Sequence, residues 1–197
     1  MAPSLSQAIR WGTRLSTLAT MRNLIQAERL RAEHALLRRD AFLDELTGLA
    51  NRRGFHHYVN GLAAREVEKV AMLLVDVDNF KSVNDNFGHA TGDAALARLA
   101  QILANSVRPG DLAVRIGGDE FVILLADTEI DVARDRAHAV LVAMVSEPWW
   151  EIHPELQVTI CIGIAAEHPS QIDELAARAD AALYRAKAAG GARYATG

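Results

Sequence analysis

The chain reads VRIGGDEFVILL over residues 114–125, and this stretch decides how the rest of the sequence is interpreted. Two short apolar runs flank a GGDE turn, which predicts a β-hairpin with two carboxylates, Asp119 and Glu120, at its tip. Gly117 and Gly118 permit the positive φ angles of a tight turn and leave bare backbone against which a charged group can lie. Adjacent carboxylates repel each other, by about 1 kcal/mol at about 4 Å in water. The hairpin therefore predicts a site that attracts a cation.

The GGDEF motif at residues 117–121, preceded by Arg115 and Ile116, resembles the signature of GGDEF-domain diguanylate cyclases. Further stretches, described below, resemble the same family at matching spacing, and the resemblance covers residues 44–194. It implies an α+β fold in which a ferredoxin-like βααββαβ order, with an additional small hairpin, builds an antiparallel-centred sheet like the palm of nucleotide cyclases and polymerases.

Composition limits the classes of protein that the chain can belong to. With 197 residues, of which 50% are hydrophobic, the sequence predicts one globular domain and an appendage. A formal net charge of -4 argues against a nucleic-acid partner. The single cysteine, Cys161, excludes an intramolecular disulfide and is expected in the core. No apolar run approaches the roughly 20 residues of a membrane span, and no signal peptide is visible, so we expect a cytoplasmic protein without a membrane span.

Residues 1–43 are predicted to form a helical stalk, because they are rich in Leu, Ala, Arg and Glu and contain no proline or glycine after Gly12 until the next segment. A lone helix of this length has no core of its own, so its apolar stripe must find a partner. We expect a parallel homodimeric coiled coil, with a helix folded back on its own domain as the alternative. The stripe is interrupted by arginines and comprises Leu15, Leu18, Ile25, Ala32, Leu36 and Leu43.

The second domain is predicted to span residues 44–197. It opens with DELTGLANRR at residues 44–53, which either is a linker with a turn or, by resemblance, is the sequence with which GGDEF domains begin. Arg52 and Arg53 receive no catalytic role from this pattern. Further along, we expect helices at residues 130–145 and 172–189 and a strand at residues 157–164.

A buried strand is predicted where the chain reads VAMLLVDVD over residues 70–78. A carboxylate at the end of such a strand is costly unless a cation or hydrogen bonds satisfy it. Asp76 is therefore interpreted as a metal ligand, against an N-cap or a buried ion pair, while Asp78 can equally cap the helix that follows. The family resemblance implies that Asp76, the backbone carbonyl of Val77 and Asp119 bind Mg²⁺, with Mn²⁺ as an alternative.

A polar loop is expected at residues 84–93, where the sequence NDNFGHATGD resembles the guanine-binding run of the family. The resemblance implies that Asn84 and Asp93 contact the base. A carboxylate can accept from guanine N1–H and the exocyclic amine together, whereas adenine offers no such pair of donors, so Asp93 favours GTP over ATP. The alternative for Asp93 is an N-cap of a helix over residues 94–107.

Four residues are candidates for the remaining contacts with GTP. Phe80 and Lys81 follow the metal motif, and Lys81 can reach a phosphate or remain a solvated lysine. The terminal YRAKAAGGAR run resembles the family sequence in which a lysine and an arginine contact the triphosphate. Lys187 matches the lysine, but Gly191 stands where the arginine is commoner, so Arg193 is a weaker candidate.

The sequence RPGD at residues 108–111 has two interpretations. Proline and glycine typically end a helix and make a turn. By resemblance, Arg108 and Asp111 also match an inhibitory site that binds the product, cyclic di-GMP. In such a site the arginine stacks on guanine and makes two parallel hydrogen bonds to it, and the aspartate accepts from the N–H groups of guanine.

The resemblance as a whole implies a diguanylate cyclase that joins two GTP molecules into cyclic di-GMP with release of pyrophosphate, acts as a homodimer and is inhibited by its product. Glu120, or Asp119 through the metal, would assist deprotonation of the ribose 3′-hydroxyl. Two alternatives are a non-catalytic cyclic di-GMP receptor that signals through the stalk and a cyclase with a single-nucleotide product.

Overall fold

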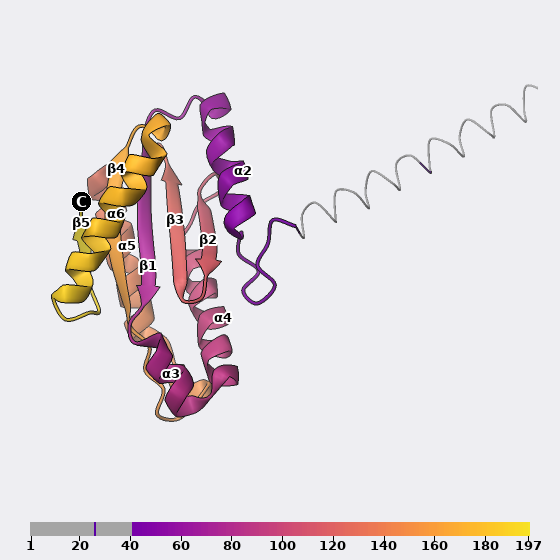
Figure 1. The fold of residues 1–197 in the computed structure, drawn as a ribbon, viewed down its shortest axis with the longest axis vertical. Coiled ribbons are helices and arrows are strands. Elements are labelled where there is room, and N and C mark those ends of the chain that lie inside the picture. Colours follow the sequence, from indigo (N-terminus) through magenta and orange to yellow (C-terminus); the bar gives the residue numbers. More distant parts are fainter. Residues whose placement is uncertain (1–25, 27–40) are drawn as a thin grey trace, which may run out of the picture. The chain divides into compact units, whose positions relative to one another are not determined.

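The computed structural model describes residue 26 and residues 41–197 (Figure 1), and residues 42–197 form one compact unit. The stalk predicted at residues 1–43 therefore lies almost wholly outside the described residues. The helical dimer and the domain boundary near residue 44 stay predictions. No helix among the described residues is both long enough and apolar enough to cross a membrane.

One five-stranded sheet forms the centre of the domain, with the strand order β2-β3-β1-β4-β5. β1 is the middle strand and runs antiparallel to both β3 and β4, β2 and β3 form an antiparallel hairpin, and β5 lies parallel to β4 at the edge. The predicted α+β class with an antiparallel-centred sheet is confirmed. The strands are β1 (Val70–Val77), β2 (Leu112–Gly117), β3 (Glu120–Ala126), β4 (Ile160–Glu167) and β5 (Tyr194–Thr196).

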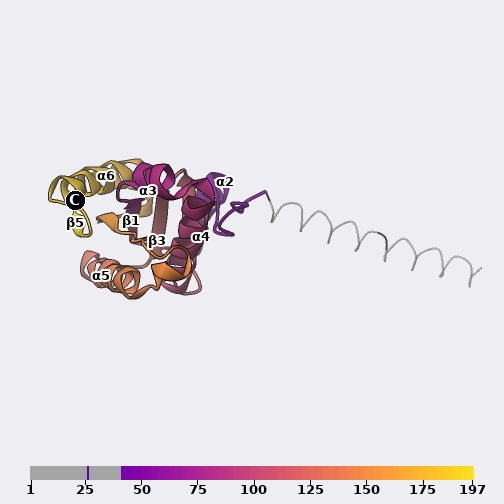
Figure 2. The ribbon, with the colours of Figure 1, turned by 90° about the horizontal axis from the view of Figure 1, so that it is seen from below.

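Helices cover both faces of this sheet (Figure 2). The core on one face takes side chains from α3, α4 and α5, and the core on the other face takes them from α2 and α6. Both faces of β1 are therefore buried, which explains its nearly continuous apolar sequence. The helices are α2 (Arg52–Leu62), α3 (Phe80–Phe87), α4 (His89–Asn105), α5 (Ile130–Ser146) and α6 (Ile172–Ala188), with 3-10 turns at Ala63–Arg65, Trp149–Glu151 and Pro169–Gln171.

Three details of the predicted secondary structure are wrong. The loop expected at residues 84–93 is replaced by two helices joined through Gly88 alone, whose φ of 84° is easily adopted only by glycine. Asp93 consequently lies within α4 and does not cap it. The strand expected at residues 157–164 begins at Ile160 and continues to Glu167. The additional small hairpin is not present among residues 41–197, where a 3-10 turn follows α5.

The contact between α6 and β4 is unusually close at Gly163. A Cβ atom added there would lie 2.1 Å from the carbonyl oxygen of Ala179 and 2.4 Å from the backbone nitrogen of Leu183. Only glycine lets the helix backbone approach the strand to this distance. The position of α6 matters for the site, because its last turn carries Lys187.

Candidate active site

The predicted β2–β3 hairpin is confirmed, and it places acidic side chains beside the end of β1. Gly118 has a φ of 54°, and Asp119 follows it in the turn. Glu120 is the first residue of β3 and lies directly opposite Asp76 in the antiparallel pair. Directly opposed residues point to the same face, with Cβ atoms roughly 5 Å apart. The backbone N–H of Val77 donates to the carbonyl oxygen of Asp119 at 3.3 Å.

Asp76 forms an ion pair with the last turn of α6. Its Oδ1 lies 2.7 Å from Nζ of Lys187, and the Asp76 side chain is 11% exposed while that of Lys187 is 44% exposed. One of the alternatives considered for Asp76, a buried ion pair, is therefore present. An ion pair and a metal site do not exclude each other, because a partly exposed lysine can leave when a divalent cation arrives.

The charges around this pair are unbalanced. Burial raises the pKa of Asp76, and although Lys187 lowers it, the neighbouring carboxylates of Asp119 and Asp78 raise it further, so the net shift is upward. Burial alone would lower the pKa of Lys187, but the hydrogen bond to Asp76 and the charges of Asp76 and Asp119 outweigh it. The lysine is thus stabilised as a cation, whereas burial of the aspartate outweighs the effect of its lysine partner.

The donor set fits a magnesium ion that arrives with phosphate. Residues 41–197 contain no group of three or more His, Cys, Asp or Glu side chains able to hold a metal by themselves. Mg²⁺ is usually bound by one or two carboxylates together with substrate phosphates and water, so two aspartates suffice. Burial, together with the neighbouring carboxylates of Asp119 and Asp78, raises the pKa of Asp76, and a bound cation would relieve both effects. The roles of Asp76, Val77 and Asp119 as metal ligands stay predictions.

Asp78 does not cap α3, contrary to one expectation. Asn79, which precedes the helix, is left-handed and makes no side-chain cap. Oδ2 of Asp78 instead accepts hydrogen bonds from Oγ1 of Thr159 at 2.8 Å and from the backbone N–H of Ala192 at 2.9 Å. The carboxylate thereby ties the end of β1 to the segments before β4 and after α6. Sequence reasoning missed this contact.

A cavity of about 320 Å³ opens between these segments. Lys187 and Asp76 line it together with the carboxylate of Asp78 and the glycines that follow α6, so a phosphate group can approach backbone there. Arg193 does not line it: its Nε donates to the carbonyl oxygen of Gly191 at 3.0 Å, so the side chain folds back on its own loop. The lining residues are Asp76, Asp78, Asn79, Thr159, Lys187, Gly190 and Gly191.

The residues predicted to bind guanine lie on the α3–α4 pair, beyond the end of β1 (Figure 1). Asn84 is half-buried on α3, and Asp93 is exposed on α4. Lys81 is exposed on the first turn of α3, whereas Phe80 packs partly against the core. Neither Asn84 nor Asp93 lines the 320 Å³ cavity. Asn84 lies one helical turn after Lys81 on α3, and the cavity is lined by residues that precede this helix or lie outside it.

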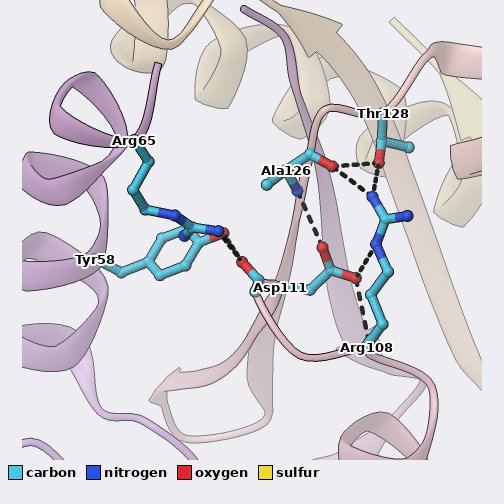
Figure 3. A network of polar contacts seen from close by, with 7 residues as sticks. Tyr58, Arg65, Arg108, Asp111, Ala126 and Thr128 are labelled. Carbon is cyan, nitrogen blue, oxygen red and sulfur yellow. Dashed lines mark hydrogen bonds and ion pairs between the residues drawn. The ribbon is translucent and has the colours of Figure 1, made fainter. Parts of the chain in front are cut away.

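The carboxylate of Asp111 is turned into the protein (Figure 3). Its side chain is 2% exposed and accepts from the backbone N–H groups of Arg108 at 3.2 Å and Ala126 at 3.1 Å. Nε of Arg108 lies 3.5 Å from the carboxylate, and its Nη2 donates to the carbonyl oxygen of Ala126 at 2.8 Å. The two residues predicted to bind product therefore satisfy each other, and only Arg108, 59% exposed, faces solvent.

Helix α2 and the 3-10 turn that follows it hold the same turn from its other side (Figure 3). The hydroxyl of Tyr58 donates to the carbonyl oxygen of Gly110 at 2.6 Å, and Nη2 of Arg65 donates to that oxygen at 3.1 Å. The guanidinium of Arg65 also lies 5.4 Å from the centre of the Tyr58 ring. The turn at residues 108–111 is thus a fixed part of the domain.

Arg115 links the first turn of the domain to the tip of the hairpin. Its Nη1 lies 3.0 Å from Oδ1 of Asp44, while Nε and Nη2 donate to the carbonyl oxygen of Gly118 at 3.0 and 2.8 Å. Burial raises the pKa of Asp44, but hydrogen bonds from Thr47 and Arg115 lower it by more. Sequence reasoning noted Arg115 in the motif and gave it no role, although an arginine two residues before the paired glycines was a usable signal.

In this antiparallel-centred α+β domain, the end of β1 and the last turn of α6 bring two aspartates and a lysine to one cavity, which suits a phosphorylated ligand with a cation. The family described as "Diguanylate cyclase, GGDEF domain" matches residues 41–193. The chain therefore belongs to the GGDEF-domain family of diguanylate cyclases, as its motifs predicted.

Individual relatives agree with this assignment. The chain is 38% identical over 176 residues to diguanylate cyclase DgcM of Escherichia coli (strain K12), covering 86% of this chain and 41% of that protein. It is 39% identical over 157 residues to the response regulator PleD of Caulobacter vibrioides (strain NA1000 / CB15N), covering 76% of this chain and 35% of that protein. The chain thus spans about two-fifths of the length of these curated relatives.

Solved structures share the fold. The crystal structure of the coiled coil and GGDEF domain of DgcB from Caulobacter crescentus in complex with c-di-GMP matches with a TM-score of 0.80 at 27% identity, covering 92% of this chain and 98% of that one. The GGDEF domain of PA1120 from Pseudomonas aeruginosa (PAO1) matches with a TM-score of 0.67 at 30% identity, covering 78% and 93%.

Proposed function

We propose that this protein is a diguanylate cyclase that joins two GTP molecules into cyclic di-GMP and releases pyrophosphate. The observation that carries the proposal is the hairpin tip, where Asp119 and Glu120 adjoin Asp76 and where Lys187 lies 2.7 Å from Asp76. A hairpin retained only for structure would not need two acidic residues beside the buried carboxylate of Asp76. Similarity to proteins named diguanylate cyclases supports the same activity.

Asp76, Asp119 and the carbonyl of Val77 would hold Mg²⁺ or Mn²⁺. The bound ion would neutralise phosphate charge and lower the pKa of the attacking 3′-hydroxyl. Lys187 would exchange its contact with Asp76 for a phosphate oxygen, because its side chain is 44% exposed and already lines the cavity. Lys81 is the second candidate for a phosphate contact, and Arg193 would have to leave Gly191 to become a third.

The other side chains would bind the base and move a proton. Glu120 is exposed at the start of β3, so its carboxylate can accept the proton of a ribose 3′-hydroxyl. Asn84 and Asp93 would contact the edge of guanine, for which a carboxylate and an amide are chemically suited. Phe80, which precedes Lys81 and packs partly against the core, would also contact GTP.

Two domains must cooperate, because each would hold one GTP and the product contains two. Residues 1–43, with their apolar stripe, are the proposed dimerisation segment. Joining two domains raises their effective concentration. Since GTP is available in the cytoplasm, we place the reaction there.

Incubation of the purified full chain with GTP and Mg²⁺, with products identified by mass spectrometry, tests the proposal. Wild type should form cyclic di-GMP, and Asp119→Ala should lose about 10²–10³-fold in rate, the loss typical when a group that stabilises transition-state charge is removed. Asp131→Asn is the matched control, because this α5 carboxylate is 83% exposed and pairs only with neighbouring Arg134 among the described residues. A single-nucleotide cyclic product, or none from a chain that binds cyclic di-GMP, would contradict the proposal.

We further propose that cyclic di-GMP inhibits the enzyme through Arg108 and Asp111. The exposed guanidinium of Arg108 is suited to stack on guanine and to make two parallel hydrogen bonds to it. Asp111 would accept a hydrogen bond from guanine once the Arg108 side chain has moved away from its carboxylate. Opening this pair need not disturb the turn, because Tyr58 and Arg65 hold Gly110 independently.

Arg108→Ala is expected to relieve product inhibition with little loss of stability. The carbonyl oxygen of Ala126 keeps its hydrogen bond from Thr128 when the arginine is removed. Asp111→Ala is the less suitable variant, because it leaves two backbone N–H groups without their acceptor at a cost of about 1–3 kcal/mol each. The measurement is the initial rate as a function of added cyclic di-GMP. Equal inhibition of wild type and Arg108→Ala would contradict the proposed site.

A further inference from the structure

Gly92, on the first turns of α4, lies against the side chain of Asn84. A Cβ atom added to Gly92 would lie 2.0 Å from Oδ1 and 3.1 Å from Cγ of Asn84, and 3.2 Å from Cζ of Phe80. These two neighbours belong to α3, so the close approach joins two helices. The amide of Asn84 therefore occupies the space that any other residue at position 92 would fill with its own side chain.

The geometry of the helix pair explains why the approach is so close. Only Gly88 separates the end of α3 from the start of α4. Its backbone N–H donates to the carbonyl oxygen of Asn84 at 2.9 Å, and its own carbonyl oxygen accepts from the N–H of Gly92 at 3.2 Å. Gly88 is thus hydrogen-bonded to both residues, and the fold fixes the distance between their backbones.

The amide of Asn84 is otherwise unrestrained. Within residues 41–197, no other group donates to or accepts from this side chain, which is half-buried. Its hydrogen-bonding groups remain available for a ligand, and its direction is set by the space at Gly92. Helix propensity favours alanine over glycine inside a helix, so local structure gives no reason for a glycine at this position.

We propose that Gly92 is a positioning residue for guanine recognition: the absence of its side chain directs the amide of Asn84 toward the edge of the base. The inference rests on the proposed function, in which Asn84 and the neighbouring Asp93 contact guanine. An added methyl group would push the amide away and misalign its donor and acceptor. Gly92 would then control which base is bound without contacting the nucleotide itself.

Gly92→Ala tests the inference in the full chain, with Mg²⁺ and nucleotides that bind but cannot cyclise. The probes are 3′-deoxy-GTP and 3′-deoxy-ATP, and affinity is measured by calorimetry. Gly92→Ala should weaken 3′-deoxy-GTP about tenfold, because roughly that factor accompanies the loss of one or two hydrogen bonds. The affinity for 3′-deoxy-ATP should change less than about twofold, since adenine does not use the same contacts.

A double-mutant cycle separates positioning from general damage to the helix pair. In an Asn84→Ala background the clashing amide is absent, so adding Gly92→Ala should cause no further loss of 3′-deoxy-GTP affinity. The matched control is Gly61→Ala in α2, where an added Cβ meets nothing within 4 Å. The melting temperature of each variant establishes that it is folded.

The outcomes distinguish this inference from the proposed function. A wild-type chain with no preference for 3′-deoxy-GTP over 3′-deoxy-ATP would refute guanine recognition, and the role of Gly92 with it. If wild type prefers guanine and Asn84→Ala loses the preference, an unchanged Gly92→Ala would refute only the role of Gly92. Equal losses from Gly92→Ala with and without Asn84 would show a structural effect and would also overturn the inference.

Discussion

Asp76→Asn should abolish nearly all cyclase activity while leaving the domain folded. The expected loss is about 10³-fold in kcat/KM, at the upper end for removal of one electrostatic contact in an active site, because asparagine is isosteric but brings no charge to bind a cation. Binding of 3′-deoxy-GTP should lose its dependence on Mg²⁺ in the same variant, which gives a readout independent of turnover.

The stability of Asp76→Asn should equal or exceed that of wild type. Burial and the nearby carboxylates of Asp119 and Asp78 raise the pKa of Asp76 in spite of Lys187, so the folded state disfavours the charged form. An acidic group whose pKa is higher in the folded than in the unfolded state lowers the free energy of unfolding as pH increases toward the folded pKa. At neutral pH this loss of stability is complete, and replacement by a neutral asparagine removes it. Lys187 loses its partner but is 44% exposed and remains hydrated. A large fall in melting temperature, or activity close to wild type, would contradict the assigned role.

Gly163→Ala should be the most destabilising of these substitutions. The added methyl carbon would lie 2.1 and 2.4 Å from backbone atoms of α6, which cannot move without displacing the whole helix from β4. Overpacking of a core usually costs about 1–3 kcal/mol, and contact with backbone on this scale places the expected loss at about 3 kcal/mol or more. For a domain of this size, the melting temperature should fall by about 6–12 °C.

Thermal unfolding of Gly163→Ala beside Gly61→Ala makes the comparison. Gly61 lies in α2 with no neighbour within 4 Å of an added Cβ, so its substitution should be neutral or stabilising by up to about 1 kcal/mol. A melting temperature of Gly163→Ala within about 2 °C of wild type would show that α6 can shift away from the sheet. Activity in such a variant would then report whether Lys187 had moved with the helix.

Much of the fold was predictable because its strongest signals are local. The GGDE turn between two apolar runs predicted β2 and β3, and a continuous apolar run predicted β1. The amphipathic segments at residues 130–145 and 172–189 became α5 and α6 with nearly the expected bounds. Each of these patterns is contained in one stretch of sequence, and burial in the folded domain agrees with it.

The errors arose where a local pattern supports two structures. Asn, Asp and Gly at residues 84–93 are typical of a loop, but Val83 and Leu96 bury α3 and α4 in the core and keep both helical. Val158 and Thr159 have the β-branched character of a strand, yet their segment enters the sheet only from Ile160. Tertiary packing decided both cases, and a single sequence does not contain that information.

The contacts that shape the candidate site were the least predictable part. Asp78 and Ala192 are separated by 114 positions along the chain and meet only because α6 returns the C-terminal segment to the end of β1. The ion pair of Asp76 with Lys187 has the same origin. The burial of Asp111 could not be anticipated either, because its two backbone donors come from different segments.

The guanidinium of Arg115 contacts both Asp44 and the backbone of Gly118. These two contacts restrict where this GGDEF domain can be fused to another domain. A chimera in which another domain is joined downstream of Asp44 would keep the contact of Arg115 with Gly118 and lose its contact with Asp44. Junctions upstream of residue 42 preserve both. An arginine at position 115 can thus hold the hairpin tip through Gly118 and the start of the domain through Asp44 at the same time.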